Sequence, residues 1–319
     1  MWLTEERVRF FPITLFAVVM GLAGLAIAYE KAYHLLGLPK WPFVFLLGLS
    51  TLLFINNLIV YTVKFVRFPE EVQKEFFHPV RMNFFPAASI AMLLLSIGYY
   101  SFWPFVSVPL WFVGALVHLG FTLYIISYWI KNNFELTHSN PAWFIPIVGN
   151  VIIPVVGVDI LGSEAMVFFF GVGIFFWIVL FTVMFYRIIF HHQMAQKFLP
   201  TLFILIAPPA VGFIAYLRIT ANYDLFAVLL LDIGLFFTLL LFFMGRSFLK
   251  LKFFISWWAF TFPLDAITIA TTVAYQVTGY GFYRYTAYGL LVITTAVIGI
   301  VAYQTLLHVR KKEICIDEG

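Results

Sequence analysis

The chain has 319 residues, of which 63% are hydrophobic and 11% are charged, and its formal net charge is +4. Soluble domains of this size carry roughly a quarter charged residues, so this composition excludes a soluble protein and indicates a polytopic membrane protein. The single cysteine, Cys315, lies in a polar tail and excludes an intrachain disulfide.

Ten apolar segments follow one another, each near or above the roughly 20 residues that a helix needs to cross the hydrocarbon core. They cover residues 10–29, 41–63, 82–100, 104–130, 141–158, 164–190, 199–217, 223–245, 253–278 and 285–307. The first segment lacks a small-residue cleavage site, so we expect it to be retained as a span. No linker is long enough to separate two domains. We therefore expect a single integral membrane domain over residues 1–319, with short tails at 1–9 and 308–319.

The distribution of Lys and Arg over the connections predicts the orientation. The side that holds the N-terminus carries fifteen of the nineteen: Arg7, Arg9, Lys64, Arg67, Lys74, Arg81, Lys131, Arg187, Lys197, Arg246, Lys250, Lys252, Arg310, Lys311 and Lys312. The opposite side carries the remaining four, Lys31, Lys40, Arg218 and Arg284. By the positive-inside rule we expect both termini to be cytoplasmic in the plasma (inner) membrane. The basic excess then reflects orientation and not binding to nucleic acid.

The prolines well inside the apolar segments fall in the odd-numbered ones, and the even-numbered segments have prolines only at their edges, as at Pro42, Pro104 and Pro109, or none. Those well inside are Pro12, Pro86, Pro146, Pro154, Pro208, Pro209 and Pro263. A proline removes a backbone donor, and in lipid its helix needs protein neighbours or a cavity to satisfy the freed carbonyl. We therefore expect an all-α fold of five helix hairpins, with an inner ring of five kinked odd helices inside an outer ring of five even ones. Curved inner helices favour a path along the axis, and the alternative is a kinked but solid core.

Four motifs in order resemble a known family. They are HPVRMNFFP at 78–86, NPAWFIPIVGNVIIPVVG at 140–157, APPA at 207–210 and WWAFTFP at 257–263. Together they resemble the tellurite-resistance/dicarboxylate transporter family, which includes TehA-like proteins and the slow anion channels of plant guard cells. The resemblance runs from about Pro12 to Leu307. It implies a homotrimer in which every protomer has its own anion pore within five inner helices.

The resemblance also implies that a phenylalanine of the ninth helix plugs the pore, and the matching residue is Phe262. Its depth agrees with that role. Phe262 lies ten residues beyond Lys252, which is about 15 Å into a hydrocarbon core about 30 Å thick. A bulky apolar ring at this depth blocks hydrated ions and opens by a change of rotamer.

Asp265 follows Phe262 by three residues, about 60° round the helix, and a carboxylate at this depth is costly. Three interpretations compete. Asp265 is buried against a donor of a neighbouring inner helix, or is held protonated by desolvation, or is a site that couples transport to protons. The third interpretation would make the protein a secondary transporter.

Other residues are candidates for the pore and its entrance. The pore-lining candidates are Met20, Gly21, Ser89, Asn150, Pro208 and Asp265. Asn150 either contacts the permeant or hydrogen-bonds a carbonyl freed by Pro154. His78 and Arg81, at the cytoplasmic mouth, either attract anions together with a helix N-terminus or anchor the interface by pairing with Glu70, Glu71 or Glu75.

The sequence favours transport over catalysis. It holds no nucleotide-binding loop and no arrangement of catalytic side chains, and the histidines lack companions at metal-ligand spacing, so we expect no enzyme, cofactor or metal. His118 and Asp232, on even segments, are expected to serve helix contacts. The leading hypothesis is a gated channel or exporter for small anions. The alternative is a proton-coupled carrier of C4-dicarboxylates or of oxyanions such as sulfite or tellurite, based on Asp265.

Overall fold

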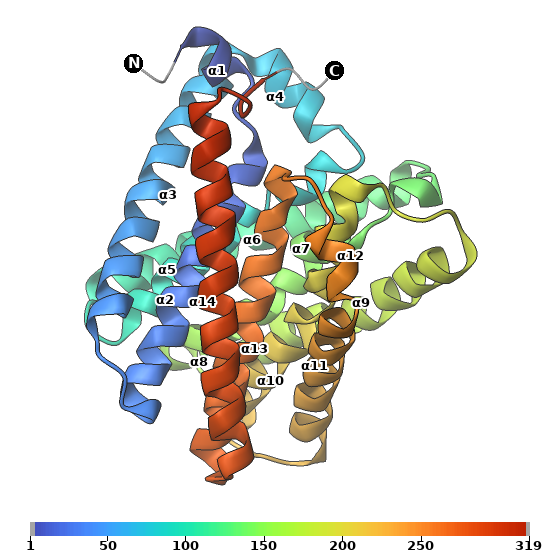
Figure 1. Cartoon of the computed structure of the whole chain (residues 1–319). Helices are drawn as coiled ribbons and strands as arrows, with labels where there is room; N and C mark the ends of the chain where they lie inside the picture. Colours follow the sequence, from blue (N-terminus) through green and yellow to red (C-terminus); the bar gives the residue numbers. More distant parts are fainter. Residues whose placement is uncertain (1–3, 317–319) are drawn as a thin grey trace.

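The structure is a computed structural model that describes residues 4–316, and every regular element in this range is a helix. Figure 1 shows a bundle of long helices with both termini at one end, where the short helices α1 and α4 also lie. We call this end the N/C end. The prediction of an all-helical polytopic membrane protein is confirmed.

The elements are α-helices and shorter 3-10 segments. The α-helices are α1 (Glu5–Arg9), α2 (Phe16–Leu36), α3 (Trp41–Arg67), α4 (Pro69–Phe76), α5 (Ala87–Tyr100), α6 (Pro104–Lys131), α7 (Ile145–Val148), α8 (Pro154–Leu161), α9 (Ser163–Phe190), α10 (Ala207–Thr220), α11 (Leu225–Phe243), α12 (Gly245–Leu249), α13 (Thr261–Thr278) and α14 (Gly281–Arg310). The 3-10 segments are η1 (Ile13–Leu15), η2 (Arg81–Phe84), η3 (Leu136–His138), η4 (Pro141–Phe144), η5 (Gly149–Ile152), η6 (Gln196–Leu205) and η7 (Ile255–Phe260).

Nine helical stretches in residues 4–316 are long and apolar enough to cross a membrane. They are Ile13–Leu36, Trp41–Arg67, Arg81–Tyr100, Pro104–Lys131, Pro141–Leu161, Ser163–Phe190, Gln196–Thr220, Leu225–Phe243 and Gly281–Arg310. The sequence analysis predicts one further span, residues 253–278, and this stretch forms η7 and α13. It is less apolar than the others because α13 contains Asp265 and five threonines.

Burial alternates along the chain. In the stretches that contain α2, α5, α8 and α10, 83%, 78%, 67% and 83% of the most apolar window is buried. The corresponding shares are 33%, 33%, 22%, 39% and 28% for α3, α6, α9, α11 and α14. Helix α13 resembles the first group, since twelve of its 18 residues are buried. Helices α2, α5, α8, α10 and α13 contact one another in this order, and α13 contacts α2 again. The core therefore lies among these five helices.

Most prolines of the buried helices lie where a 3-10 segment passes into an α-helix, while Pro12 precedes η1 and Pro200 lies within η6. Pro86 directly precedes α5, Pro154 begins α8, and Pro208, Pro209 and Pro263 lie in the first turns of α10 and α13. A proline suits this position because an N–H there would lack an intrahelical partner. The sequence predicts kinked helices; the structure instead has 3-10 lead-ins that come from the N/C end, each followed by an α-helix.

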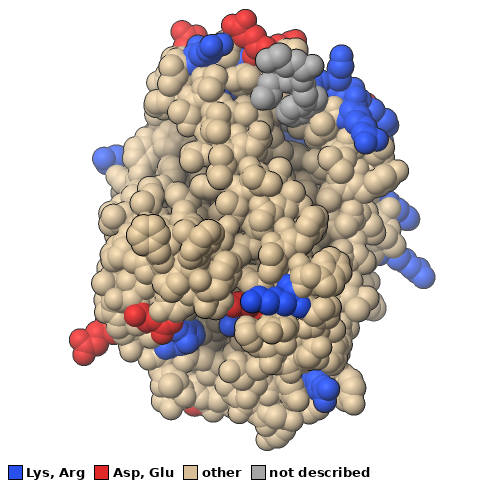
Figure 2. All heavy atoms as spheres, turned by 90° about the vertical axis from the view of Figure 1, so that its left-hand side faces the viewer, with Lys and Arg blue, Asp and Glu red and all other residues tan. Residues whose placement is uncertain are grey.

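The outer surface is divided between charged ends and an apolar middle. In Figure 2, charged side chains gather at the N/C end and in a lower band, with a broad surface of other residues between them. Large exposed apolar side chains such as Phe105, Phe175 and Phe243 belong to the less buried helices α6, α9 and α11. Such exposure suits contact with lipid tails and not with water.

Candidate functional site

A cavity of about 660 Å³ extends from the N/C end into the core of the bundle. Most of its polar lining residues define what we call the mouth: Arg9, Lys64, Glu71, Lys74, Glu75, His78, Arg81, Lys197, Ser256, His308 and Glu313. The residues that define its inner end are mostly apolar: Met20, Ala87, Ile90, Gly149, Val151, Ile152, Pro208, Val211, Phe262 and Pro263. The cavity thus leads from charged side chains to an apolar interior.

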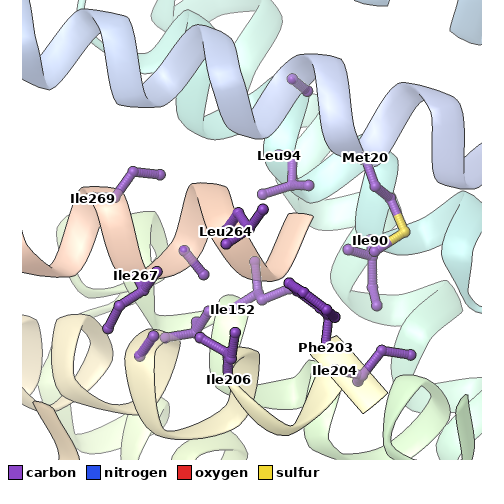
Figure 3. Packing of buried hydrophobic residues seen from close by; sticks show 14 of the residues in the cluster. Met20, Ile90, Leu94, Ile152, Phe203, Ile204, Ile206, Leu264, Ile267 and Ile269 are labelled. Atoms are coloured by element: carbon purple, nitrogen blue, oxygen red, sulfur yellow. The ribbon is translucent and has the colours of Figure 1, made fainter. Parts of the chain in front are cut away.

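The inner end is built from the beginnings of buried helices. Ala87 begins α5, Pro208 is the second residue of α10, and Phe262 is the second residue of α13. Figure 3 shows Met20 of α2 and Ile90 of α5 beside one another in this region, across from Ile152, Phe203 and Ile204. Helix N-termini carry a partial positive charge from aligned peptide dipoles. The inner end therefore favours anions although no charged side chain of residues 4–316 lines it.

Phe262 lies at the inner end next to Pro263, in the first turn of α13. Its side chain is partly buried, and it packs against the core while it also lines the cavity. Trp258 and Ala259 of η7 line the cavity on the approach to it. Met20 and Pro208, two of the other predicted pore residues, line the same cavity.

His78 and Arg81 both line the mouth, as candidates for anion attraction. The Nδ1 atom of His78 accepts hydrogen bonds from the backbone N–H groups of Val80 (3.1 Å) and Arg81 (3.2 Å), so the ring caps the start of η2. Burial, followed by the charges of Arg81 and Lys197, lowers the pKa of His78 below its ordinary value. His78 is therefore neutral at neutral pH, and the positive charge of this part of the mouth comes from Arg81 and Lys197.

Two of the three acids that the sequence offers as partners for His78 and Arg81, Glu71 and Glu75, contact other cations. Glu71 accepts from Arg9 at 2.6 Å and from Lys74 at 3.3 Å. The hydrogen bond from Arg9 is the main reason that the pKa of Glu71 is lowered. Glu75 is buried and pairs with Lys64 at 2.7 Å. One buried ion pair and two more exposed ones thus join the side chains of the mouth.

Ser89 and Asn150 are buried, and neither lines the cavity. The Ser89 hydroxyl lies 2.8 Å from the Pro86 carbonyl, to which it donates, and 2.9 Å from Nδ1 of His118 on α6. Asn150 donates to the Thr122 hydroxyl of α6 at 2.8 Å and to the Ile147 carbonyl at 2.7 Å. These side chains tie buried helices to α6, so the structure places them behind the cavity wall.

Asp265 and Gly21 also lie outside the cavity lining. Asp265 is fully buried, and neither carboxylate oxygen has a hydrogen-bond partner among residues 4–316. Its side chain packs against α2 at Gly24, where a Cβ atom would come within 2.5 Å of Oδ2 of Asp265. Gly21 lies against Thr261 and Trp258 in the same interface between α2 and α13. Small residues of α2 therefore allow the close approach of α13.

The structure adds two features that the sequence analysis does not assign to the site. Lys197 is counted there only toward orientation, yet it lines the mouth. Like Arg81, Lys197 lies in the first turn of a 3-10 lead-in. This shared position is the feature that could have identified Lys197 as a residue of the mouth.

The described end of the chain also turns back to the cavity. Ile314 and Cys315 line it and are buried in a small cluster with Phe11, Leu15 and Val60. Burial raises the pKa of the Cys315 thiol to about 12. Within the polar tail, Ile314 and Cys315 are thus buried, because this segment packs against the start of the chain.

These features define a class: an all-helical polytopic membrane protein with a cavity that runs from a charged mouth to an apolar inner end. The family follows from comparison with known proteins. The SLAC1 family model, described as voltage-dependent anion channel, matches residues 10–306, and the chain belongs to this family. The resemblance found in the sequence motifs is thereby confirmed.

The chain is similar to proteins from archaea, plants and bacteria. An uncharacterised transporter of Methanocaldococcus jannaschii is 29% identical over 311 residues, which covers 90% of this chain and 91% of the relative. The S-type anion channel SLAH2 of Arabidopsis thaliana is 31% identical over 269 residues, 82% of this chain and 52% of the relative. A tellurite resistance protein TehA homolog of Haemophilus influenzae is 27% identical over 275 residues, 83% of this chain and 81% of the relative.

Proposed function

We propose that this protein is a gated channel or exporter for small anions, in which the cavity is the cytoplasmic vestibule of a pore and Phe262 closes the pore. The observation that carries the proposal is the inner end of the cavity, where the beginnings of buried helices and the ring of Phe262 lie together. Membership of an anion-channel family supports the same substrate class. The chain then needs neither a cofactor nor an enzymatic step.

In this proposal η7 and α13 together form one more membrane span, which raises the number of spans from nine to ten. This span is the ninth in chain order. The five buried helices make an inner ring, and α3, α6, α9, α11 and α14 surround it. The alternating burial and the contacts from α2 round to α13 support this arrangement. The excess of Lys and Arg at the N/C end supports cytoplasmic termini in the plasma (inner) membrane. We further propose a homotrimer, with one pore in each protomer.

The division of charge along the cavity suits rapid passage of anions. Lys197 at the mouth attracts anions from solution. The inner end offers helix N-termini but no side-chain cation among residues 4–316, so an anion is stabilised there without being held tightly. Conduction requires binding that is favourable enough for entry and weak enough for exit.

The test is anion conductance of the purified protein in planar bilayers, wild type against Phe262→Ala. We expect higher chloride conductance in the variant, because removal of the ring opens the apolar constriction. The matched control is Phe260→Ala: this ring, two residues earlier, packs against Phe203 and Phe248 and does not line the cavity. Equal conductance in wild type and Phe262→Ala would falsify the gate.

A second candidate function is a proton-coupled carrier of dicarboxylates or oxyanions. The observation that favours it is Asp265, a fully buried carboxyl group without a hydrogen-bond partner among residues 4–316, one turn beyond Phe262 on α13. An ionised carboxylate in such a place is costly, so movement of α13 would couple to its protonation.

Reversal potentials separate the two functions. A channel gives currents that follow the chloride gradient and ignore an imposed pH gradient. A carrier gives a flux that follows the pH gradient and loses this component in Asp265→Asn. Glu30→Gln on α2 is the matched control, because Glu30 is also a buried acid outside the cavity lining but does not lie on α13.

A further inference from the structure

The ring of Phe262 has no aromatic partner of its own. It is partly buried and lines the cavity, yet no ring of residues 4–316 stacks on it or meets its edge. The ring of Phe260, two residues earlier, contacts both Phe203 and Phe248. The position of the Phe262 ring therefore depends on the backbone of η7 and α13, and on the contacts that hold this backbone in place.

Trp258 anchors η7 to α14. Its Nε1–H donates to the Thr305 hydroxyl at 3.0 Å, and that hydroxyl donates to the Val301 carbonyl at 2.7 Å. Because a hydroxyl has a single proton, the second bond leaves Thr305 as an acceptor for the indole. Only 2% of Trp258 is exposed, although the residue lines the cavity. The indole is thus almost fully withdrawn from water, and its donor would be costly to leave without an acceptor.

Trp258 also contacts α2 and the first residue of α13. The Trp258 carbonyl accepts from the Thr261 hydroxyl at 2.7 Å, and Thr261 directly precedes Phe262. On α2, a Cβ atom at Gly21 would lie 3.3 Å from the ring of Trp258 and would overlap the side chain of Thr261. Trp258 therefore lies between α14, α2 and the residue that precedes Phe262.

Two other side chains of η7 donate hydrogen bonds, but to short connections near the mouth. Trp257 donates to the carbonyl of Lys252, which directly precedes η7 by a few residues, and Ser256 donates to the carbonyl of Lys197 in η6. Both bonds are exposed to solvent, so water competes for their donors and acceptors. Of these three bonds, only that of Trp258 connects η7 to a long helix.

We propose that Trp258 is a positioning residue for the gate: its bond to Thr305 holds η7 against α14 and so keeps the Phe262 ring at the inner end of the cavity. This inference rests on the proposed role of Phe262. Opening moves η7 away from α14 and breaks the bond, so the bond stabilises the closed channel alone. Its removal shifts the equilibrium toward the open channel by about two- to tenfold.

The experiment is single-channel recording of the purified full-length protein in planar bilayers, wild type against Thr305→Val. Valine keeps the shape of the side chain and removes the acceptor, and Thr305 does not line the cavity. We expect the open probability to rise by about two- to tenfold. The chloride conductance of the open channel should stay unchanged, because no residue of the cavity lining is altered.

The matched control is Thr295→Val, also on α14. The Thr295 hydroxyl has the same kind of partners, since it donates to the Leu291 carbonyl at 2.7 Å and lies 3.0 Å from the Tyr29 hydroxyl of α2. Its side-chain partner is not part of η7, so Thr295→Val should leave the open probability unchanged.

Trp258→Phe keeps an aromatic ring and removes the Nε1–H donor, so it tests the same bond even where Thr305→Val does not fold. We expect it to raise the open probability as well, and the double variant Trp258→Phe/Thr305→Val to show no larger rise than the stronger single variant. Because both substitutions act through Phe262, neither should change the conductance of Phe262→Ala, whose constriction is already open.

The outcomes separate this inference from the gate itself. A higher conductance in Phe262→Ala, with an unchanged open probability in Thr305→Val and Trp258→Phe, overturns the inference and leaves the gate in place. An effect of Thr305→Val that persists in the Phe262→Ala background also overturns it, because Trp258 then acts on another part of the pore. An unchanged conductance in Phe262→Ala overturns the gate and the inference together.

Discussion

Replacement of Glu75 by glutamine tests the most buried ion pair of the mouth. Glu75 and Lys64 are 2.7 Å apart, and their side chains are 5% and 4% exposed. Glu75 also accepts from the Ile13 backbone N–H at 2.8 Å and from the Tyr61 hydroxyl at 2.9 Å. Lys64 donates in addition to the Phe11 carbonyl at 2.8 Å. The pair therefore joins α3, α4 and the start of the chain through fully formed hydrogen bonds.

The magnitude follows from this burial. Glu75→Gln keeps the shape of the side chain but leaves the Lys64 ammonium without its counter-charge. Removal of one partner of a buried ion pair destabilises a protein by about 3–5 kcal/mol. Glu71→Gln, on the same helix α4, breaks bridges to Arg9 and Lys74, whose side chains are 48% and 70% exposed. Such surface pairs contribute only about 0–1 kcal/mol.

The assay is thermal unfolding of the purified protein in detergent, followed by circular dichroism. We expect Glu75→Gln to melt several degrees below Glu71→Gln. The double variant Lys64→Met/Glu75→Met removes both charges and should recover most of the lost stability, since an apolar replacement of a whole buried pair is often neutral. Melting of Glu75→Gln at the same temperature as Glu71→Gln would refute the reasoning.

Three further predictions concern single side chains. Gly24→Ala places a Cβ atom 2.5 Å from Oδ2 of Asp265 and should lower stability by about 1–3 kcal/mol. Gly48→Ala, where a Cβ meets no heavy atom within 4 Å, is its control in the same melting assay. Folding lowers the pKa of His78, so stability should fall as the pH drops below 6.5, the ordinary pKa of histidine. His78→Gln should lessen this fall. A variant whose melting temperature depends on pH as the wild type's does would contradict this prediction. Cys315 should react with iodoacetamide much more slowly than an exposed thiol at neutral pH, as measured by intact mass; rapid labelling would mean that the segment around it opens.

Much of the architecture could be predicted because it rests on patterns of the sequence. Apolar segment length gives the helices, and the prolines single out the segments that turn out to be buried. The motif around Phe262 led to a residue that the structure places at the inner end of the cavity. These signals are local, so a single sequence contains them.

The positions of the polar side chains could not be predicted in the same way. Helical spacing places Asp265 about 60° from Phe262, but only the packing of α13 on Gly24 decides that its carboxyl group lies outside the cavity lining. Asn150 likewise turns toward Thr122 because α6 passes behind it. The burial of Cys315 depends on contacts with Phe11, far away in the sequence. Contacts between distant segments determine each of these outcomes.

The 3-10 lead-in η7 has a consequence for the motion of Phe262. A 3-10 helix rises about 2.0 Å per residue and turns about 120°, whereas an α-helix rises about 1.5 Å and turns about 100°. Conversion of the six residues of η7 to α geometry would shorten the segment by about 3 Å and rotate all that follows by about 120°. The winding of one short segment next to the mouth therefore sets both the depth and the direction of the Phe262 ring.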